Sequence, residues 1–117
     1  MKKHEMRLHN SPFKLIKEGT KTIELRLNDE KRQIIEIGDI IKFTNRITLE
    51  ELEVEVINLH TYPNFEELYK HFDKVSMGYD IDEEANPNDM TQYYSKEEQN
   101  KYGVLGIEIR KYIESDK

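Results

Sequence analysis

The sequence predicts a small α+β domain built on a mixed or antiparallel β-barrel of five or six strands, with about three short helices. Stretches of alternating apolar and polar residues come before and between short helical stretches, without the regular strand–helix alternation of a doubly wound parallel sheet. The chain has 117 residues, of which 36% are hydrophobic and 36% charged. That length supports one hydrophobic core and not two, so we expect a single domain over residues 1–117.

The first expected elements are a short strand at residues 6–8 and a two-turn helix after it. Ser11 is predicted to cap the N-terminus of this helix, and Pro12 to stand in its first turn, where the missing N–H of proline leaves no bond unmade. Gly19 then suits the left-handed residue that commonly ends a helix.

The next strand, residues 21–27, carries the polar side chains of most interest. Strict alternation puts its apolar side chains on one face, namely Ile23, Leu25 and Leu27. The opposite face carries Thr22, Glu24 and Arg26. Lys21 stands where the helix joins the strand, so it need not follow the alternation and is free to lie beside Glu24.

Three further segments are expected before the middle of the chain. Residues 28–32 have the composition of a polar turn, and residues 38–39 form a Gly-Asp turn that leads into a strand at residues 40–43. A long strand covers residues 49–59, and its apolar phase slips in the second half. Because such a slip moves side chains to the other face of a sheet, we predict a β-bulge there.

The second half begins with a helix whose start is marked by Asn64 and Glu67, in the spacing of a capping box. Its apolar stripe consists of Phe65, Leu68, Tyr69 and Phe72. Periodicity is lost over residues 74–92, and a loop of this length in a small domain is commonly functional. A second capping box at residues 95–98 opens a short helix, and residues 103–109 form the last strand.

Charge is unevenly distributed along the chain. The net charge is −6, which argues against a protein that coats long nucleic acids without specificity. Residues 1–46 nevertheless carry eleven Lys and Arg against seven Asp and Glu, whereas residues 47–117 carry seven against seventeen. This asymmetry predicts a confined basic cleft on an acidic protein, or else a chance distribution among solvated faces.

Several classes of site and location are disfavoured by composition. The absence of Cys excludes disulfides, thiolate metal sites and a cysteine nucleophile, and the four His lack the spacing of metal ligands. We therefore expect no metal and no cofactor. The apolar runs are too short to span a membrane, and no apolar stretch follows the first residues, so we expect a cytoplasmic protein without a signal peptide.

Three stretches carry a resemblance to a known family. The longest is Pro12-Phe13-x-x-Ile16-Lys17-x-Gly19-x-Lys21-Thr22-Ile23-Glu24-x-Arg26-Leu27-x-Asp29-Glu30-Lys31-Arg32. The second is Gly38-Asp39-x-Ile41-x-Phe43. The third is Tyr93-Tyr94-Ser95-x-Glu97-Glu98-Gln99-x-x-Tyr102-Gly103-Val104-x-Gly106-Ile107. Through them, the chain resembles the short bacterial type of the ASCH domain family, in the PUA-like superfamily, over about residues 6–113.

The resemblance implies a β-barrel with helices across its ends and a cleft between barrel and helices. It also implies a relation to RNA, and some short bacterial relatives look like amidohydrolases that act on N4-acetylcytidine. Those relatives use a Lys-x-x-Thr motif, whose lysine falls on Lys21 and whose threonine position is occupied by Glu24. Their catalytic glutamate has no counterpart that can be aligned here.

The candidate site residues are cationic, carboxylate and aromatic. Lys21, Glu24 and Arg26 are suited to a phosphate or a pyrimidine, because amines and guanidinium groups donate to oxygens and a carboxylate accepts from an exocyclic amine. Thr22 is a neighbouring hydroxyl, Lys31 and Arg32 suit a phosphate, and Tyr93 suits stacking on a base. The alternative interpretations are a salt-bridge ladder that orders the barrel, an ordinary solvated turn, and tyrosines half-buried for their area.

The function predicted is binding of RNA, or of a modified nucleoside or nucleotide, in a basic cleft. One alternative is a small amidohydrolase that removes the acyl group from N4-acetylcytidine, with Lys21 and Glu24 as catalytic residues in place of the motif threonine. A further alternative is a protein-binding adaptor. The expected partner is RNA or a nucleotide-sized ligand, with no membrane and no metal, and the expected state is a monomer or weak homodimer.

Overall fold

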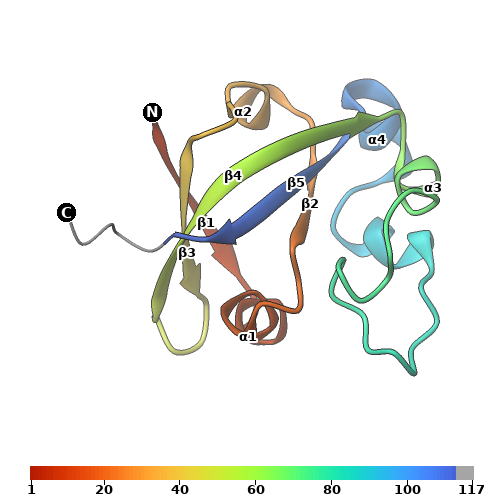
Figure 1. Cartoon of the computed structure of the whole chain (residues 1–117). Coiled ribbons are helices and arrows are strands. Elements are labelled where there is room, and N and C mark those ends of the chain that lie inside the picture. Colours follow the sequence, from red (N-terminus) through yellow and green to blue (C-terminus); the bar gives the residue numbers. More distant parts are fainter. Residues whose placement is uncertain (113–117) are drawn as a thin grey trace.

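A computed structural model describes residues 1–112, so the last five residues of the expected domain lie outside the described part. Five strands form one sheet in the order β1-β3-β4-β5-β2, which curls into a half-barrel (Figure 1). The strands are β1 (Lys3–Leu8), β2 (Ile23–Leu27), β3 (Ile40–Asn45), β4 (Glu51–Tyr62) and β5 (Val104–Lys111). The β1–β3 pair is parallel and the other pairs are antiparallel, which confirms the predicted mixed, barrel-like α+β fold.

The helices are short. They are α1 (Asn10–Glu18), α2 (Glu30–Gln33), α3 (Phe65–Leu68), the 3₁₀ helix η1 (Pro87–Gln92) and α4 (Lys96–Tyr102). In Figure 1, α1 and α2 lie at opposite ends of β2, whereas α3 and α4 lie together on one side of the sheet. The count within residues 1–112 exceeds the predicted three because two of the short elements, α2 and η1, carry no apolar periodicity that a sequence pattern reveals.

The start of α1 differs from the prediction. Ser11 is not the N-cap, because the helix begins at Asn10 and the capping position is His9, whose side chain makes no capping bond. A tertiary contact accounts for the shift: Asn45 Nδ2 donates to Asn10 Oδ1 over 2.9 Å and ties the first turn of α1 to the end of β3. The C-terminal prediction is confirmed, since Gly19 has a φ of 92° and closes the helix.

The structure also bears on the predicted polar turn, the predicted helix after the long strand and the predicted bulge. The polar turn at residues 28–32 contains α2, which begins where Asp29 accepts from the backbone N–H of Arg32. The helix expected across residues 65–72 is only the single turn α3, because residues 69–72 continue as turns and bends. The predicted bulge in the long strand is confirmed by a register shift between Val56 and Asn58.

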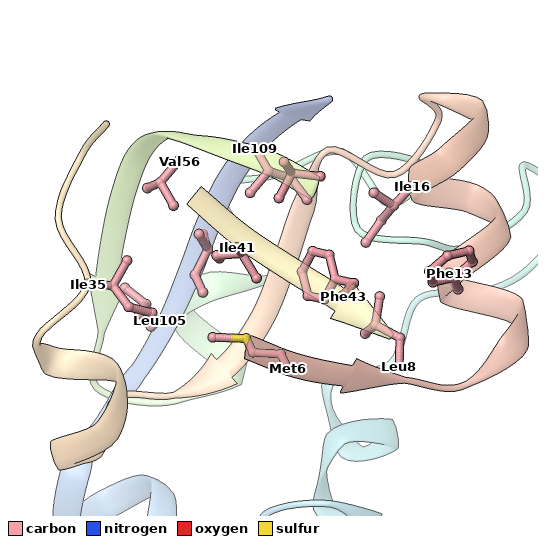
Figure 2. Close-up of a cluster of buried hydrophobic side chains, with 12 residues drawn as sticks. Met6, Leu8, Phe13, Ile16, Ile35, Ile41, Phe43, Val56, Leu105 and Ile109 are labelled. Atoms are coloured by element: carbon pink, nitrogen blue, oxygen red, sulfur yellow. The ribbon is translucent and has the colours of Figure 1, made fainter. Parts of the chain in front are cut away.

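Two groups of apolar side chains form the core. The first fills the inside of the curled sheet (Figure 2) and comprises Met6, Leu8, Phe13, Ile16, Ile35, Ile41, Phe43, Val54, Val56, Leu105, Ile107 and Ile109. The second comprises Ile23, Leu25, Leu27, Phe65, Leu68, Met77, Met90 and Val104. The apolar face of β2 belongs to this second group, so it anchors α3 and the segment after it. The polar face of β2, which carries Glu24 and Arg26, points away from this group.

The buried carboxylate of Asp39 holds the N-terminal strand to the Gly-Asp turn. His4 Nε2 lies 2.8 Å from Oδ2, and the amides of Lys2 and Glu36 each donate to the carboxylate over 3.0 Å. Burial alone would raise the pKa of Asp39, but these hydrogen bonds outweigh it and lower the pKa from 3.8 to about 2. The ionised group therefore stabilises the fold at neutral pH.

Replacing Asp39 with asparagine is expected to lower the free energy of unfolding by about 2 kcal/mol at pH 7, the value that corresponds to the lowered pKa. Because the stabilisation is present above the unfolded pKa and lost as the pH falls through the folded pKa, the difference from wild type should shrink between about pH 4 and pH 2. Urea denaturation at several pH values measures it. The exposed Asp82→Asn change is the control; a pH-independent difference for Asp39→Asn would contradict the assignment.

Candidate functional site

A cleft of about 700 Å³ lies where the two edge strands of the half-barrel, β1 and β2, face each other. Its walls come from the end of β1, the first turn of α1, the polar face of β2 and the long segment before α4. The charged lining side chains are Arg7, Lys21, Glu24, Arg26, Arg32, Arg46, Glu83 and Asp89. The aromatic lining side chains are His9, Tyr69, Tyr79, Tyr93 and Tyr94.

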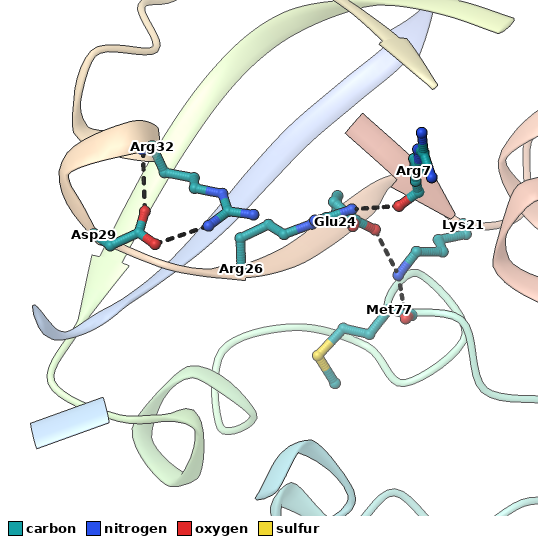
Figure 3. Close-up of polar contacts among 7 residues, drawn as sticks. All are labelled: Arg7, Lys21, Glu24, Arg26, Asp29, Arg32 and Met77. Carbon is teal, nitrogen blue, oxygen red and sulfur yellow. Dashed lines mark hydrogen bonds and ion pairs between the residues drawn. The ribbon is translucent and has the colours of Figure 1, made fainter. Parts of the chain in front are cut away.

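The floor of the cleft is a buried ion-pair network (Figure 3). Glu24 Oε2 accepts from Arg26 Nε over 2.7 Å, and Glu24 Oε1 lies 3.5 Å from Lys21 Nζ. Lys21 and Glu24 are only 6% and 4% exposed. Lys21 precedes the first residue of β2, which is why it shares a face with Glu24 as the sequence allowed. The predicted salt-bridge ladder is therefore present.

Burial and charge act against each other on this network. Burial lowers the pKa of Lys21, and the neighbouring Glu24 carboxylate opposes this only in part. Burial also tends to raise the pKa of Glu24, but the charges of Arg26 and Lys21 outweigh it and lower that pKa. Glu24 is therefore a carboxylate at neutral pH, and an acceptor for ligand N–H groups.

Arg26 also bridges the two edges of the sheet. Its Nη2 donates over 3.0 Å to the backbone carbonyl of Arg7 on β1, and Figure 3 shows that this oxygen, and not the Arg7 guanidinium, meets Arg26. No β1–β2 pairing joins these strands within residues 1–112, so the Arg26 side chain connects edges that backbone hydrogen bonds leave apart. The Arg26 guanidinium is consequently held in place at the floor of the cleft.

The long segment of residues 74–92 forms the opposite wall. Lys21 Nζ donates to the carbonyl of Met77 over 2.8 Å, and Gly78 follows with a φ of 111°. A Cβ on Gly78 would lie 3.2 Å from Lys21 Cδ, so this position requires glycine both for its backbone angle and for the close approach. Farther on, the Tyr79 hydroxyl donates to Asp89 Oδ2 over 2.7 Å and lies 2.9 Å from the Tyr69 hydroxyl. These bonds hold the segment against the sheet.

The cleft carries unpaired hydrogen-bond donors. Within residues 1–112, the side chains of Arg7 and Arg46 have no hydrogen-bond or ion-pair partner, and both are exposed. Arg32 donates from Nη1 to Asp29 over 2.8 Å, but its Nε is buried and has no partner among the described residues. An unpaired buried donor is unfavourable, so this nitrogen lowers the stability gained from the Arg32–Asp29 pair.

Of the predicted site residues, five line the cleft and two do not. The five are Lys21, Glu24, Arg26, Arg32 and Tyr93. Thr22 lies outside it and is engaged through its backbone with Ser76 and Ile109. Lys31 is exposed on α2, away from the lining. Thr22 precedes the first residue of β2 and Lys31 lies in α2, so the alternation of side chains along a strand applies to neither residue.

Sequence reasoning missed Arg7 and Arg46 as cleft residues. Alternation in β1 gave a signal for Arg7, because Met6 and Leu8 point into the core and Arg7 must point away. Arg46 follows the last residue of β3, and its amide donates to the carbonyl of Leu8 over 2.9 Å. Only the parallel β1–β3 pairing brings these two arginines together, and no local pattern encodes it.

Within residues 1–112, no group of three or more His, Asp or Glu side chains is arranged to hold a metal ion. None of the helices in that range has the length and apolar character needed to cross a bilayer.

The curled five-stranded sheet with flanking helices defines an α+β domain of the PUA-like fold. The model of the ASCH domain family matches residues 6–113, and this chain belongs to that family. The similarity found in the sequence motifs is thereby confirmed.

Two solved structures, both of proteins from Pyrococcus, are similar to the chain. The crystal structure of hypothetical protein PH0355 is 35% identical, with a TM-score of 0.76, and the alignment covers 96% of this chain and 100% of that one. The solution NMR structure of protein PF0455 from Pyrococcus furiosus is 32% identical, with a TM-score of 0.68, covering 97% of this chain and 99% of that one. No match was found among curated proteins.

Proposed function

We propose that this ASCH domain binds RNA or a nucleotide-sized nucleic-acid ligand in the cleft between β1 and β2. The observation that carries the proposal is the charge of the cleft. Its described lining has five Lys and Arg side chains against three Asp and Glu, on a chain whose net charge is −6. A confined positive site on an acidic protein attracts a small anionic ligand without coating the protein with long polyanions. RNA binding is also frequent in this family.

The floor of the cleft is suited to the edge of a base. The Glu24 carboxylate accepts from N–H groups, while the Lys21 amine and the Arg26 guanidinium donate to carbonyl oxygens. Since the floor residues are already held by one another and by Met77, they require little reorganisation on binding. A base that carries an exocyclic amine and a carbonyl on the same edge, such as cytosine or guanine, matches this pattern of donors and acceptors.

Tyr93 supplies an aromatic face beside the floor. Its side chain is 53% exposed and its ring centroid lies 6.1 Å from that of His9, which is on the other side of the cleft at the end of β1. An exposed aromatic ring at a basic cleft is the arrangement used for stacking on single-stranded bases. Tyr94, by contrast, packs against Phe65 with ring centroids 6.2 Å apart, so its ring is engaged in the core.

Titration calorimetry with the four ribonucleosides and their 5′-monophosphates tests the proposal. Tyr93→Ala is expected to weaken binding by about 1 kcal/mol or more, the contribution of one base–aromatic stack, whereas Tyr93→Phe keeps the ring and should keep the affinity. Because Tyr93 is largely exposed, neither change should alter the thermal unfolding midpoint. Failure of all eight compounds and of a short single-stranded RNA to bind would contradict the proposal.

The second candidate function is the amidohydrolase, and the lowered pKa of Lys21 favours it. A neutral Lys21 amine could take a proton from water as the water oxygen bonds to the acetyl carbon of N4-acetylcytidine. Cleavage of the C–N4 bond, with return of the proton to the leaving nitrogen, would give acetate and cytidine. The lowered pKa of Glu24 makes that carboxylate a weak base, which leaves the role to Lys21.

Mass spectrometry of the protein incubated with N4-acetylcytidine separates the two functions. Release of cytidine that is lost in Lys21→Met, with folding intact, would establish the enzyme. Binding of N4-acetylcytidine without turnover would leave the cleft a binding site. Thr22 is no candidate nucleophile in either case, since its side chain lies outside the lining.

A further inference from the structure

We propose that Arg7 and Arg46 form a phosphate subsite at the rim of the cleft, so that the ligand is a nucleotide with a terminal phosphate and not a nucleoside. This inference rests on the proposed function and narrows it. The rim is defined here as these two arginines, which come from the end of β1 and the residue after β3. Both line the cleft and both are exposed.

The two rim arginines differ from the cations of the floor. Lys21 and Arg26 share the Glu24 carboxylate, and Arg32 is paired with Asp29. Arg7 and Arg46, in contrast, have no carboxylate partner within residues 1–112. Two floor cations share one carboxylate, so the floor keeps a single net positive charge, whereas both charges of the rim are without an ion-pair partner among the described residues. The larger uncompensated charge of the cleft therefore lies at the rim.

The acidic side chains of the facing wall form no ion pair with the rim within residues 1–112. Asp89 accepts from the Tyr79 hydroxyl over 2.7 Å, and Glu83 Oε1 accepts from the backbone N–H of Asp80 over 2.7 Å. Each of these carboxylates keeps its charge, but it is held by a neutral donor of its own wall and not by a rim arginine. The unsatisfied groups facing the cleft mouth are donors, so the site is complementary to an anion.

The backbone keeps the two arginines close to each other. β1 and β3 are parallel neighbours in which Arg7 is paired with Thr44, and the Arg46 amide donates to the carbonyl of Leu8 over 2.9 Å. The Arg7 carbonyl is held in turn by Arg26 Nη2. Two like charges on adjacent strands repel each other, and an anion placed between them removes that repulsion.

A phosphate monoester fits this rim better than the other anionic groups of nucleic acids. It carries a charge of about −1.5 to −2 at pH 7 and three acceptor oxygens, whereas a phosphodiester carries a single charge. Two guanidinium groups, each able to donate two parallel hydrogen bonds, match both the charge and the number of oxygens. The terminal phosphate is therefore expected at the rim, with the base toward the Lys21–Glu24–Arg26 floor.

Titration calorimetry with matched pairs tests the subsite: cytidine against cytidine 5′-monophosphate, guanosine against guanosine 5′-monophosphate, and the dinucleotide CpG as a phosphodiester. We expect each monophosphate to bind about tenfold or more tightly than its nucleoside, and more tightly than the dinucleotide. Arg46→Ala and Arg7→Ala should remove most of this preference while leaving nucleoside affinity nearly unchanged. Added salt should reduce the preference in wild type, because exposed charges are screened.

The matched control is Arg110→Ala, which removes the same charge from an exposed arginine paired with Glu55 on the sheet, outside the cleft lining. It should leave the monophosphate preference intact. As a second readout, inorganic phosphate should shift the NMR signals of the amides around residues 7–9 and of Arg46 in wild type, with saturation, and not in Arg46→Ala.

The outcomes separate the two proposals. Equal affinity for nucleoside and monophosphate, or a preference that survives both arginine changes, would overturn the phosphate subsite and leave the proposed function standing. Equal binding of the dinucleotide and the monophosphates would overturn the terminal phosphate and assign the rim to an RNA backbone. Failure of every nucleoside, every nucleotide and a short single-stranded RNA to bind, with a clear response to inorganic phosphate, would overturn the proposed function while retaining an anion site.

Discussion

Replacing Glu24 with alanine is expected to lower the free energy of unfolding by about 3–5 kcal/mol, since removing one member of a buried ion-pair network leaves uncompensated charge inside the protein. The Lys21 amine and the Arg26 guanidinium would both lose their carboxylate partner. Glu24 is 4% exposed, so little solvent is available to replace it. Chemical denaturation at pH 7 measures the loss.

The controls for Glu24→Ala distinguish charge from shape. Glu24→Gln keeps the volume and a hydrogen-bond acceptor but not the charge, and its cost should be smaller. The triple change Lys21→Met, Glu24→Leu and Arg26→Met removes all three charges and should recover much of the stability, because well-packed apolar groups commonly replace a buried ionic network at little cost. A Glu24→Ala protein within about 1 kcal/mol of wild type would show that water reaches both cations and that the network is not structural.

Truncating Phe65 to alanine is expected to cost about 3–5 kcal/mol, the usual effect of removing a fully buried aromatic ring. Phe65 has no exposed surface and belongs to the second core group, which includes side chains of β2 and of the segment that forms the far wall of the cleft. Its ring also stacks on Tyr94, which lines the cleft. The loss of packing should therefore loosen that wall as well as lower stability.

Two measurements check the Phe65 prediction. Thermal unfolding gives the stability, and hydrogen exchange of residues 86–94 reports whether the wall is released. Ile81→Ala is the matched control, because Ile81 is an apolar residue of the same wall segment that is 73% exposed and should change stability by no more than about 0.5 kcal/mol. Unchanged exchange in Phe65→Ala, despite lower stability, would mean that η1 is held by other contacts.

The Glu24 and Phe65 predictions concern two connected parts of the cleft, its floor and its far wall. The second core group presses the segment of residues 74–92 against β2, and the carbonyl of Met77 meets Lys21 there. The cleft floor and its far wall are therefore coupled through Lys21, with Gly78 allowing the close approach. A ligand that contacts the floor is expected to stabilise the wall, and calorimetric unfolding in its presence would register this as a higher midpoint.

Much of the candidate site could be predicted from local pattern. The alternation of β2 separates Ile23 from Glu24 and Arg26, and the helix-to-strand joint releases Lys21 from that alternation. The ion-pair network is therefore foreseeable from the six consecutive positions 21–26. Lys31 and Thr22 lie outside the cleft lining because Lys31 is in α2 and Thr22 precedes β2, so strand alternation does not set the direction of either side chain.

By itself, the sequence determined the fold class, the order of the strands along the chain, the bulge in β4, the cap of α4 and the family. These are consequences of periodicity and of side-chain-to-backbone bonds that span only a few residues, such as Ser95 with Glu98. The tertiary structure alone decided where α1 begins, which strands are edges, and which arginines meet at the cleft. Those features depend on contacts between distant residues, Asn10 with Asn45 and Leu8 with Arg46, and no local pattern specifies which distant partners will meet.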